Sequence, residues 1–256
     1  MPRYKLILEY DGTAFVGWQR QDNGLSVQRV LEDAIFALCR QPVAAIAAGR
    51  TDSGVHASGQ VAHFDVERPY SADTIRDALN FHMKPHRVAV LAAEMVGDDF
   101  HARFSATGRA YRYRIVNRRA PLALDHDRAW WVAVPMDERA MAAAARHLLG
   151  HHDFTSFRAG ACQAKSPVKT LDRLDVARHG DEIVVVAAAR SFLHHQVRNM
   201  VGSLKMVGEG KWHPDDLRVA LEARDRKAGG PTAPAAGLYL TRVEYGVSPP
   251  VVARQR

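Results

Sequence analysis

The chain of 256 residues is 47% hydrophobic and 25% charged, which is ordinary for a globular protein and excludes a disordered, collagen-like or disulfide-rich chain. Its two cysteines favour a reducing cytoplasm and argue against a zinc site, and no apolar run approaches a membrane span. The net charge of +7 and the pI of about 9.6 are typical of proteins that bind nucleic acid. Arginine supplies 28 of the 35 basic residues, which suits RNA, although an arginine-rich genome produces the same bias.

The first hundred residues predict strands and helices in turn. Residues 4–10 alternate between apolar and polar side chains and predict a strand that ends at Asp11-Gly12. Ser26 is the expected N-cap of a helix whose apolar residues recur at the spacing of one helical face. A short apolar segment, a strand and a helix capped by Ser71 follow, at residues 42–48, 60–66 and 71–79.

A second series begins near residue 105 and predicts a further lobe. Within its first strand, Tyr111 and Tyr113 lie on one face and Arg112 and Arg114 on the other. We therefore predict two α/β lobes, residues 1–104 and 105–256, in an α+β fold with a cleft between them. The expected strands are 111–116, 183–189 and 238–245, and the helices are 137–149, 197–207 and one that begins at Pro214.

The segment GRTDSGVHA (residues 49–57) is the most unusual in the chain. It lies between two expected strands, where a loop of glycine and small polar residues surrounds Arg50 and Asp52. Residues two apart in an extended loop project to the same side, so we expect Arg50 to pair with Asp52 and keep its carboxylate ionised. An ionised carboxylate can act as a nucleophile. The alternative is a turn in which Asp52 caps local N–H groups.

This loop resembles the signature of the tRNA pseudouridine synthase A family. Further segments resemble the family's other motifs and follow in the family's order from residue 9 to residue 240, nearly the whole chain. They are EYDG (9–12) with GWQRQ (17–21), GQVAHF (59–64), FHARFSA (100–106), YRY (111–113), HDFTSFR (152–158), FLHHQVRNMVG (192–202) and GLYL (237–240).

The resemblance implies an isomerase that converts uridine to pseudouridine at positions 38, 39 and 40, in the anticodon arm of tRNA, without a metal or a cofactor. It implies that Asp52 is the nucleophile and that Tyr111 packs against the target base. Arg50 and Arg198 match basic residues beside the nucleophile. The implied fold has mainly antiparallel sheets flanking a basic active-site cleft, and the implied assembly is a homodimer.

The reaction breaks the N1–C1′ bond, turns the base and rejoins it through C5. Asp52 can attack C1′ or add at C6, and the sequence leaves both routes open. It also leaves open which base removes the C5 proton, and a second use of Asp52 is one option. We expect the Tyr111 ring to stack on the extruded uracil and Tyr113 to belong to the core.

Arginines dominate the stretch between Phe100 and Leu124, which contains no acidic residue. We interpret them as a phosphate-binding strip, and a solvated strand face is the alternative. The candidate RNA contacts are Arg103, Arg109 and Arg112, and the strip continues with Arg114, Arg118 and Arg119.

Paired histidines at 151–152 and 194–195, with His56 and His63, raise the question of a metal. Neither pair has the i, i+4 spacing of a helical metal site and no cysteine set supports them, so we expect no metal. The rival functions are a non-catalytic tRNA-binding protein and a metallohydrolase, and the closest alternative is a synthase acting elsewhere on RNA. Residues 80–88 depart from the family's pattern, which affects local RNA contacts rather than the chemistry.

Overall fold

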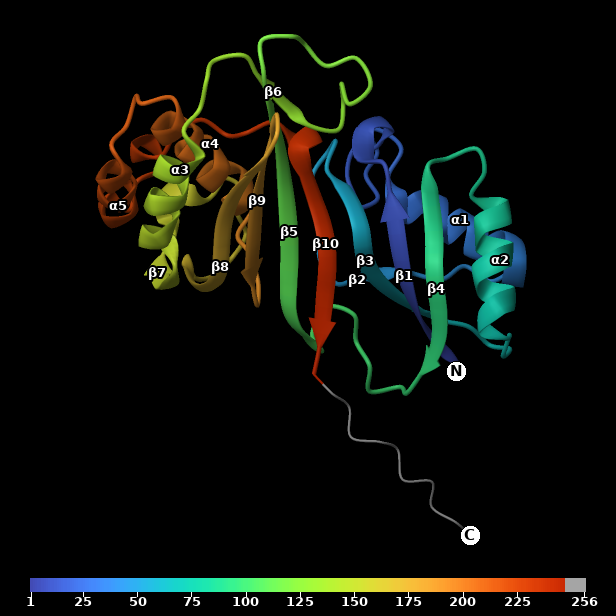
Figure 1. Ribbon diagram of the computed structural model, residues 1–256. Helices are drawn as coiled ribbons and strands as arrows, with labels where there is room; N and C mark the ends of the chain where they lie inside the picture. The colour runs from blue at the N-terminus through green and yellow to red at the C-terminus, as the bar shows by residue number, and fades with distance from the viewer. Residues whose placement is uncertain (247–256) are drawn as a thin grey trace.

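A computed structural model describes residues 1–246, whose strands form one sheet in the order β4-β1-β3-β10-β5-β9-β8-β7, with β2 beside β3 and β6 beside β5 (Figure 1). The pairs β10–β3 and β6–β5 are parallel and the others antiparallel, as the predicted fold class requires. The strands are β1 (Arg3–Tyr10), β2 (Ile46–Ala47), β3 (His56–Asp65), β4 (Val88–Val96), β5 (Ala106–Asn117), β6 (Trp130–Val132), β7 (Gly150–Asp153), β8 (Val168–His179), β9 (Glu182–Ala189) and β10 (Leu238–Tyr245).

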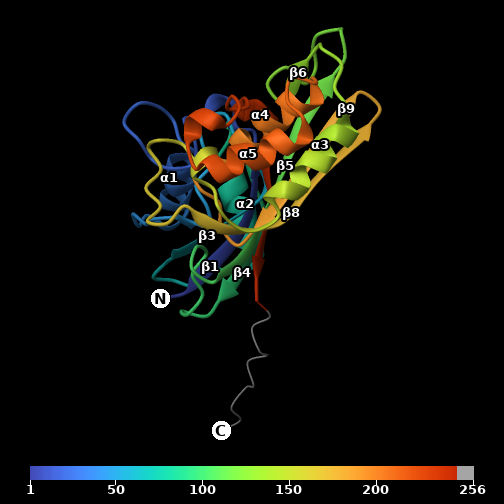
Figure 2. The same cartoon turned by 90° about the vertical axis from the view of Figure 1, so that its left-hand side faces the viewer.

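Helices pack on one face of this sheet in two groups, which Figures 1 and 2 show from two directions. The first group is α1 (Val27–Cys39) and α2 (Ala72–His82), and the second is α3 (Glu138–Ala145), α4 (Gln196–Gly208) and α5 (Pro214–Ala223). The covered face is continuous, because four residues in register across β3, β10, β5 and β9 all contact the cores beneath: Ala57, Leu240, Tyr111 and Ala187. No helix within residues 1–246 is long and apolar enough to cross a membrane.

Local sequence signals explain the first group. Ser26 Oγ accepts a hydrogen bond from Arg29 N at 3.2 Å, and Ser71 Oγ accepts one from Thr74 N at 3.0 Å, so both predicted helix caps are confirmed. The alternating residues of β1 are buried against the apolar face of α1, whose Leu31 is fully buried. Truncating Leu31 to alanine would cost about 2–5 kcal/mol of unfolding free energy.

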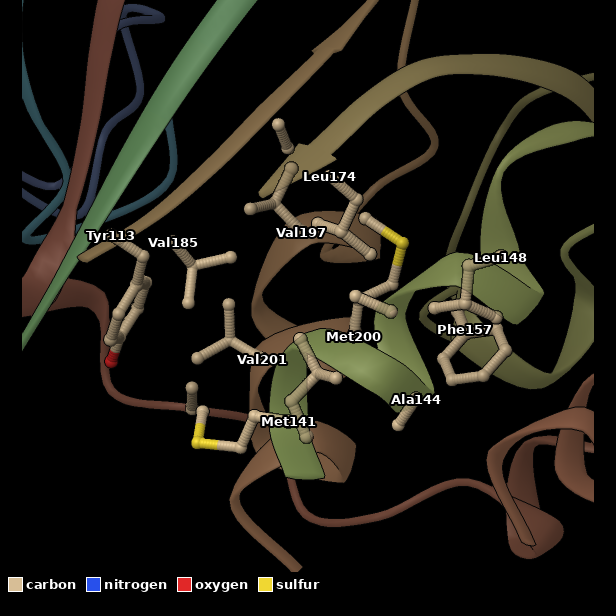
Figure 3. Packing of buried hydrophobic residues seen from close by; sticks show 14 of the residues in the cluster. Tyr113, Met141, Ala144, Leu148, Phe157, Leu174, Val185, Val197, Met200 and Val201 are labelled. Atoms are coloured by element: carbon tan, nitrogen blue, oxygen red, sulfur yellow. The ribbon is translucent and has the colours of Figure 1, made fainter. Parts of the chain in front are cut away.

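The second group covers the other half of the sheet. Figure 3 shows its core, in which Tyr113 and Val185 of the sheet face Met141 of α3 and Met200 of α4. Tyr113 is fully buried and donates a hydrogen bond to Pro234 O at 2.7 Å, which confirms it as a core residue. Pro214 occupies the first turn of α5, as predicted.

β10 joins the two halves. It pairs with β3 and with β5, and its Leu240 and Leu238 enter different cores. Because the sheet continues from β3 through β10 to β5, a division into lobes at residue 104 stays a prediction. The last ten residues of the second predicted lobe, 247–256, lie outside the described part of the chain.

The sequence pattern missed β4 and β8, which are long strands. In each strand, a register shift interrupts the alternation of buried and exposed side chains. The shift in β8 lies between Leu171 and Arg173, and the shift in β4 lies opposite Ile7 and Leu8 of β1. The unusual stretch at 80–88 leads from α2 to β4. Within it, the Asn80 side chain exchanges two hydrogen bonds with the Val90 backbone, at 2.8 and 2.9 Å, and so ties the helix to the strand.

Candidate active site

Asp52 lies in the loop between β2 and β3, and the neighbouring backbone holds this loop tightly. Val55 N donates to Asp52 O at 3.1 Å, and Trp18 N donates to Thr51 O at 3.0 Å. Gly17 adopts a φ of +111°, and a Cβ there would lie 2.6 Å from Thr51 O. The close approach therefore requires glycine, which explains why the 17–21 segment accompanies the loop.

Side chains from the sheet hold the loop from its other side. The Tyr10 hydroxyl lies 2.8 Å from Thr51 Oγ1, and Gln60 Nε2 donates to Tyr10 Oη at 3.3 Å and to Gly49 O at 2.8 Å. Burial raises the pKa of Tyr10 to about 12, so its hydroxyl stays protonated. The Asp52 loop is thus a rigid platform on the sheet.

Three cationic or ionisable side chains surround the Asp52 carboxylate. Arg198 Nη1, from the first turn of α4, lies 3.1 Å from Asp52 Oδ2. His195 Nε2 lies 3.2 Å from the same oxygen, and His194 Nε2 lies 3.3 Å from Oδ1. Arg198 is itself held, because its Nε donates to Ala233 O at 2.8 Å. The carboxylate is therefore oriented by groups from the opposite half of the molecule.

The predicted Arg50–Asp52 pair is wrong. Among residues 1–246, Arg50 makes no ion pair within 4.0 Å, and its side chain is exposed. The chain bends at Gly49 and turns at Ser53-Gly54, so the alternation expected of an extended loop does not hold there. The guanidinium beside Asp52 belongs to Arg198.

Tyr111 sits where the two cores meet, and its ring packs edge-on against Phe192 at a centroid distance of 5.2 Å. Burial, with the neighbouring Tyr10 and the negative charge of Asp52, raises the pKa of Tyr111 far above its usual value. The side chain is therefore a neutral phenol close to the carboxylate.

A cavity of about 1300 Å³ opens beside these groups. Its lining unites Asp52, Arg50, Tyr111 and Arg198, and two of the three arginines expected to contact RNA, Arg103 and Arg109. The third, Arg112, lies on the opposite face of β5 and lines another cavity. The predicted arginine strip is thus divided between two faces, and Arg114 is paired with Glu182 and Asp125.

Arg109 is bonded to protein rather than free. Its guanidinium donates to Arg190 O, Ala48 O and Arg103 O at 2.6, 2.8 and 2.9 Å. Burial lowers the pKa of Arg109, although a guanidinium stays charged. Arg109 therefore braces three backbone segments around the cavity, and an RNA contact by it stays a prediction.

His194, His195 and Phe192 were not assigned to the site from sequence. The signal was present in the segment at 192–202, where two adjacent histidines precede Arg198 by three and four residues. One ligand atom each of Asp52, His194 and His195 lies within 4.8 Å of the others, a grouping in which a cation can be held. Arg198, however, places a fixed positive charge 3.1 Å from Asp52, which opposes a divalent cation. The arrangement suits a carboxylate nucleophile better than a metal, and metal-free chemistry stays a prediction.

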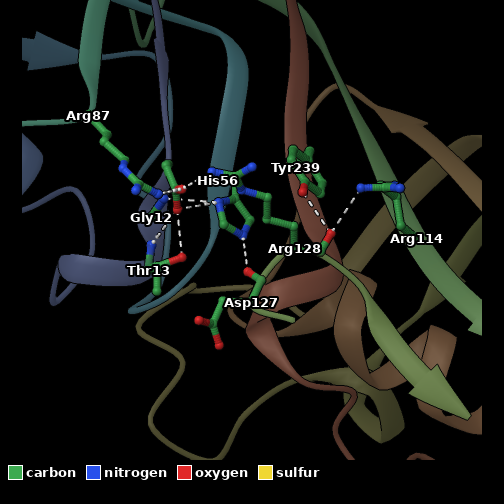
Figure 4. Close-up of polar contacts among 9 residues, drawn as sticks. Gly12, Thr13, His56, Arg87, Arg114, Asp127, Arg128 and Tyr239 are labelled. Atoms are coloured by element: carbon green, nitrogen blue, oxygen red, sulfur yellow. Dashed lines mark hydrogen bonds and ion pairs between the residues drawn. The ribbon is translucent and has the colours of Figure 1, made fainter. Parts of the chain in front are cut away.

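The cavity on the opposite face, of about 630 Å³, is built around Asp11 and His56. Figure 4 shows the His56 ring between Gly12 and Asp127: Nδ1 accepts from Gly12 N at 3.0 Å, and Nε2 lies 2.9 Å from Asp127 O. Burial lowers the pKa of His56, which fits a neutral ring engaged on both sides. His56 therefore fastens the end of the Asp52 loop to distant backbone.

Comparisons with known proteins agree with this geometry. A family model described as tRNA pseudouridine synthase matches residues 6–105 and 144–246. A tRNA pseudouridine synthase A from Paramagnetospirillum magneticum is 71% identical over 248 residues, 97% of this chain and 97% of that protein. Those of Rhodospirillum centenum and Beijerinckia indica are 62% identical over 245 residues, 96% of this chain and 100% and 94% of those proteins. The chain therefore belongs to the tRNA pseudouridine synthase family.

Proposed function

We propose that this protein isomerises uridine to pseudouridine at positions 38, 39 and 40 of tRNA, with Asp52 as the nucleophile. The observation that carries the proposal is the Asp52 carboxylate, one quarter exposed, which lines a large cavity and is oriented by Arg198. A carboxylate that was only a turn cap would have its oxygens on local N–H groups. Both Asp52 oxygens instead lie close to side chains at the start of α4: His194 and His195 just before the helix, and Arg198 in its first turn.

Both carboxylate oxygens of Asp52 have close partners. The shortest contacts of Arg198 and His195 are to Oδ2, and the shortest contact of His194 is to Oδ1. Arg198 acts as a positioning residue. It holds the carboxylate in one orientation, so less conformational entropy is lost when the reaction begins.

The cavity also suits an extruded nucleotide. Taking a base out of its stack costs a few kcal/mol, and stacking on an aromatic ring returns about 1–3 kcal/mol. Tyr111, which packs edge-on against Phe192, supplies an aromatic ring to the lining of this cavity. Arg50 and Arg103 are exposed at the same cavity and are suited to the phosphates of the tRNA backbone.

The substrate and the assembly are parts of the same proposal. The net charge of +7 supports binding to a polyanion, and the relatives carry names that specify tRNA. A homodimer in which each tRNA touches both subunits follows from the family resemblance. Light scattering checks it, and a fully active monomer contradicts it.

Asp52→Asn tests the chemistry. The variant keeps the size of the side chain but loses nearly all nucleophilicity, so it should fold, bind tRNA and form no pseudouridine. Transfer RNA tritiated at uridine C5 should release label with wild type and not with the variant. Asp33→Asn, which neutralises an exposed carboxylate on α1, is the matched control and should release label normally.

Two outcomes would oppose the proposal. Release of label by folded Asp52→Asn at a rate near wild type would show that Asp52 is not the nucleophile. If Asp52→Asn fails to fold while the control Asp33→Asn folds, Asp52 has a structural role in its loop. Mapping pseudouridine in total tRNA from a deletion strain distinguishes the anticodon arm from other RNA targets, and metal analysis of the purified protein tests the metallohydrolase.

A further inference from the structure

We propose that Arg226 is a positioning residue for the reaction. From the turn that follows α5, it fixes the Arg198 guanidinium and, through it, the Asp52 carboxylate. This inference rests on the proposed function, in which Asp52 is the nucleophile, and adds a residue that acts on Asp52 only through Arg198. The segment ARDRK (223–227) is basic and is typical of a phosphate contact, but the contacts of Arg226 indicate a different role.

The Arg226 guanidinium is bonded to protein on several sides. Its Nη1 donates to Gly229 O at 3.3 Å and to Gly230 O at 2.9 Å, which closes its own turn. Its Nη2 donates to Asn199 Oδ1 at 3.2 Å and to Thr232 Oγ1 at 3.1 Å. These four hydrogen bonds engage most of the N–H donors of a guanidinium and leave little capacity for a phosphate.

The two residues bonded by Arg226 Nη2 are the chain neighbours of Arg198 and of Ala233. Arg198 and Ala233 are joined twice, because Arg198 Nε donates to Ala233 O at 2.8 Å and Ala233 N donates to Arg198 O at 3.1 Å. Beside them, Thr232 Oγ1 donates to Asn199 Oδ1 at 2.7 Å. Arg226 therefore closes one end of a short ladder of bonds between α4 and the chain that leads to β10.

This ladder lies directly on the helix backbone. A Cβ at Gly230 would lie 2.7 Å from Ser203 Cα, and Gly230 N donates to Ser203 Oγ at 2.9 Å. On the helix side, Asn199 is only 1% exposed, and its Nδ2 donates to Phe157 O at 2.8 Å. Because both sides of the ladder are held, Ala233 O has a fixed position relative to α4.

The position of Ala233 O decides where the Arg198 guanidinium points. A guanidinium is planar, so an Nε fixed on Ala233 O also fixes the direction of Nη1, which lies 3.1 Å from Asp52 Oδ2. Without the Arg226 side chain, its turn loses two hydrogen bonds and Asn199 Oδ1 keeps only the Thr232 hydroxyl as a donor, so Ala233 O can shift. A displacement of about 1 Å in a catalytic group can lower a rate about 100-fold.

Single-turnover rates at several protein concentrations test this role. They give the maximal rate and, separately, K½, the protein concentration at which half of that rate is reached. Arg226→Gln should lower the maximal rate roughly 10- to 100-fold and leave K½ for tRNA within about threefold of wild type. Arg226→Lys keeps the charge but lacks the planar fork, so it should be nearly as slow, whereas a phosphate contact would tolerate lysine.

Two further variants separate geometry from charge. Thr232→Val removes the hydroxyl that bonds both Asn199 and Arg226 without any change of charge, and it should lower the maximal rate in the same way but less. Lys227→Gln removes a charge from the exposed neighbour of Arg226 and is the control, which should match wild type.

A double variant shows whether Arg226 acts through Arg198. In Arg198→Gln the group to be positioned is gone, so the addition of Arg226→Gln should slow the reaction by less than about threefold further. A residue that only stabilises the fold would cause the same loss of rate in both backgrounds, together with a lower melting temperature.

Three results would overturn the proposal: an Arg226→Gln variant as fast as wild type, one whose K½ rises while its maximal rate is unchanged, or equal losses of rate with and without Arg198→Gln. The second would make Arg226 a phosphate contact. If Arg226→Gln does not fold, Thr232→Val with and without Arg198→Gln decides, and equal losses count against the proposal. A wild-type protein that forms no pseudouridine would instead reject the proposed function, on which the inference rests.

Discussion

Arg198 Nη1 lies 3.1 Å from Asp52 Oδ2, although 146 residues separate the two in the chain. The contact bridges the two halves of the molecule, because Asp52 belongs to the β2–β3 loop and Arg198 to the first turn of α4. Its geometry depends on the close packing of α4 against the chain at Pro231, because a Cβ at Gly202 would lie 1.7 Å from Pro231 O. The same segment carries Ala233, whose carbonyl oxygen accepts the hydrogen bond from Arg198 Nε. The orientation of the carboxylate is therefore a property of the whole fold.

Arg198→Gln should lower kcat roughly 100-fold, because the carboxylate loses the group that orients it. Arg198→Lys keeps the charge but loses the planar geometry that reaches both Asp52 and Ala233, so its kcat should lie between those of Arg198→Gln and wild type. Single-turnover rates with saturating tRNA measure both. Arg50→Gln is the comparison: it should raise KM more than it lowers kcat, and the reverse result would restore Arg50 as the partner of Asp52.

Tyr111→Phe should retain the fold and most of the tRNA affinity, because the ring still packs against Phe192 and can still stack on a base. Tyr111→Ala should lose about 1–3 kcal/mol of binding free energy for the target nucleotide. Binding to tRNA and the rate of tritium release check the pair. If Phe is as inactive as Ala, the hydroxyl takes part in the chemistry, and Tyr111 becomes a candidate for the base that removes the C5 proton.

The arginines of the strip should differ in their effects. Arg103→Ala should weaken tRNA binding and make the slope of log K against log salt shallower by about one unit, if its guanidinium neutralises one phosphate. Arg109→Ala should lower the melting temperature as well, because three backbone carbonyls lose their donor. Binding isotherms at several salt concentrations, with thermal melts, separate the two.

Arg112→Ala tests the opposite face of the sheet. The Arg112 guanidinium lies over the Tyr239 ring, 5.3 Å from its centroid, in the cavity around Asp11. If tRNA contacts only the Asp52 side, the affinity of Arg112→Ala and its salt dependence should equal those of wild type. A weaker, less salt-dependent binding would instead extend the RNA surface to this face, as the strip interpretation expects.

His63 should make the folded state less stable in acid. Burial, with the positive charges of Arg3 and His101, lowers the pKa of His63 to about 4, whereas an unfolded histidine titrates near 6.5. Between these values the unfolded chain binds the proton and the folded chain does not, so stability falls as the pH drops through this window. The loss is about 1 kcal/mol per pH unit.

His63→Asn offers the comparison, because its amide oxygen can accept from Ala102 N, as Nδ1 does at 3.1 Å, and does not titrate. Denaturant unfolding between pH 4 and 7 should show a smaller dependence on pH for the variant than for wild type. Equal slopes would mean that His63 is protonated in the folded protein in this range.

Local signals in the sequence predicted the elements that depend only on neighbours in the chain. Ser26 and Ser71 cap their helices because a cap bonds to N–H groups three residues away. The alternation in β5 placed Tyr111 and Arg112 on opposite faces, and the two cavities they line bear this out. The family resemblance selected Asp52, whose loop the sequence marks by its glycines.

Tertiary structure alone decided which groups meet at Asp52. Arg50 is two residues away but turns aside, whereas His194, His195 and Arg198 approach from the far half of the chain. Such contacts depend on how α4 packs under the sheet and on how β10 joins β3 to β5, and neither follows from local propensity. Hydrophobic periodicity tells which face of an element is buried, but not which distant element covers it. Only the packed fold brings the Asp52 carboxylate and its three partners within 3.3 Å of one another's contacting atoms.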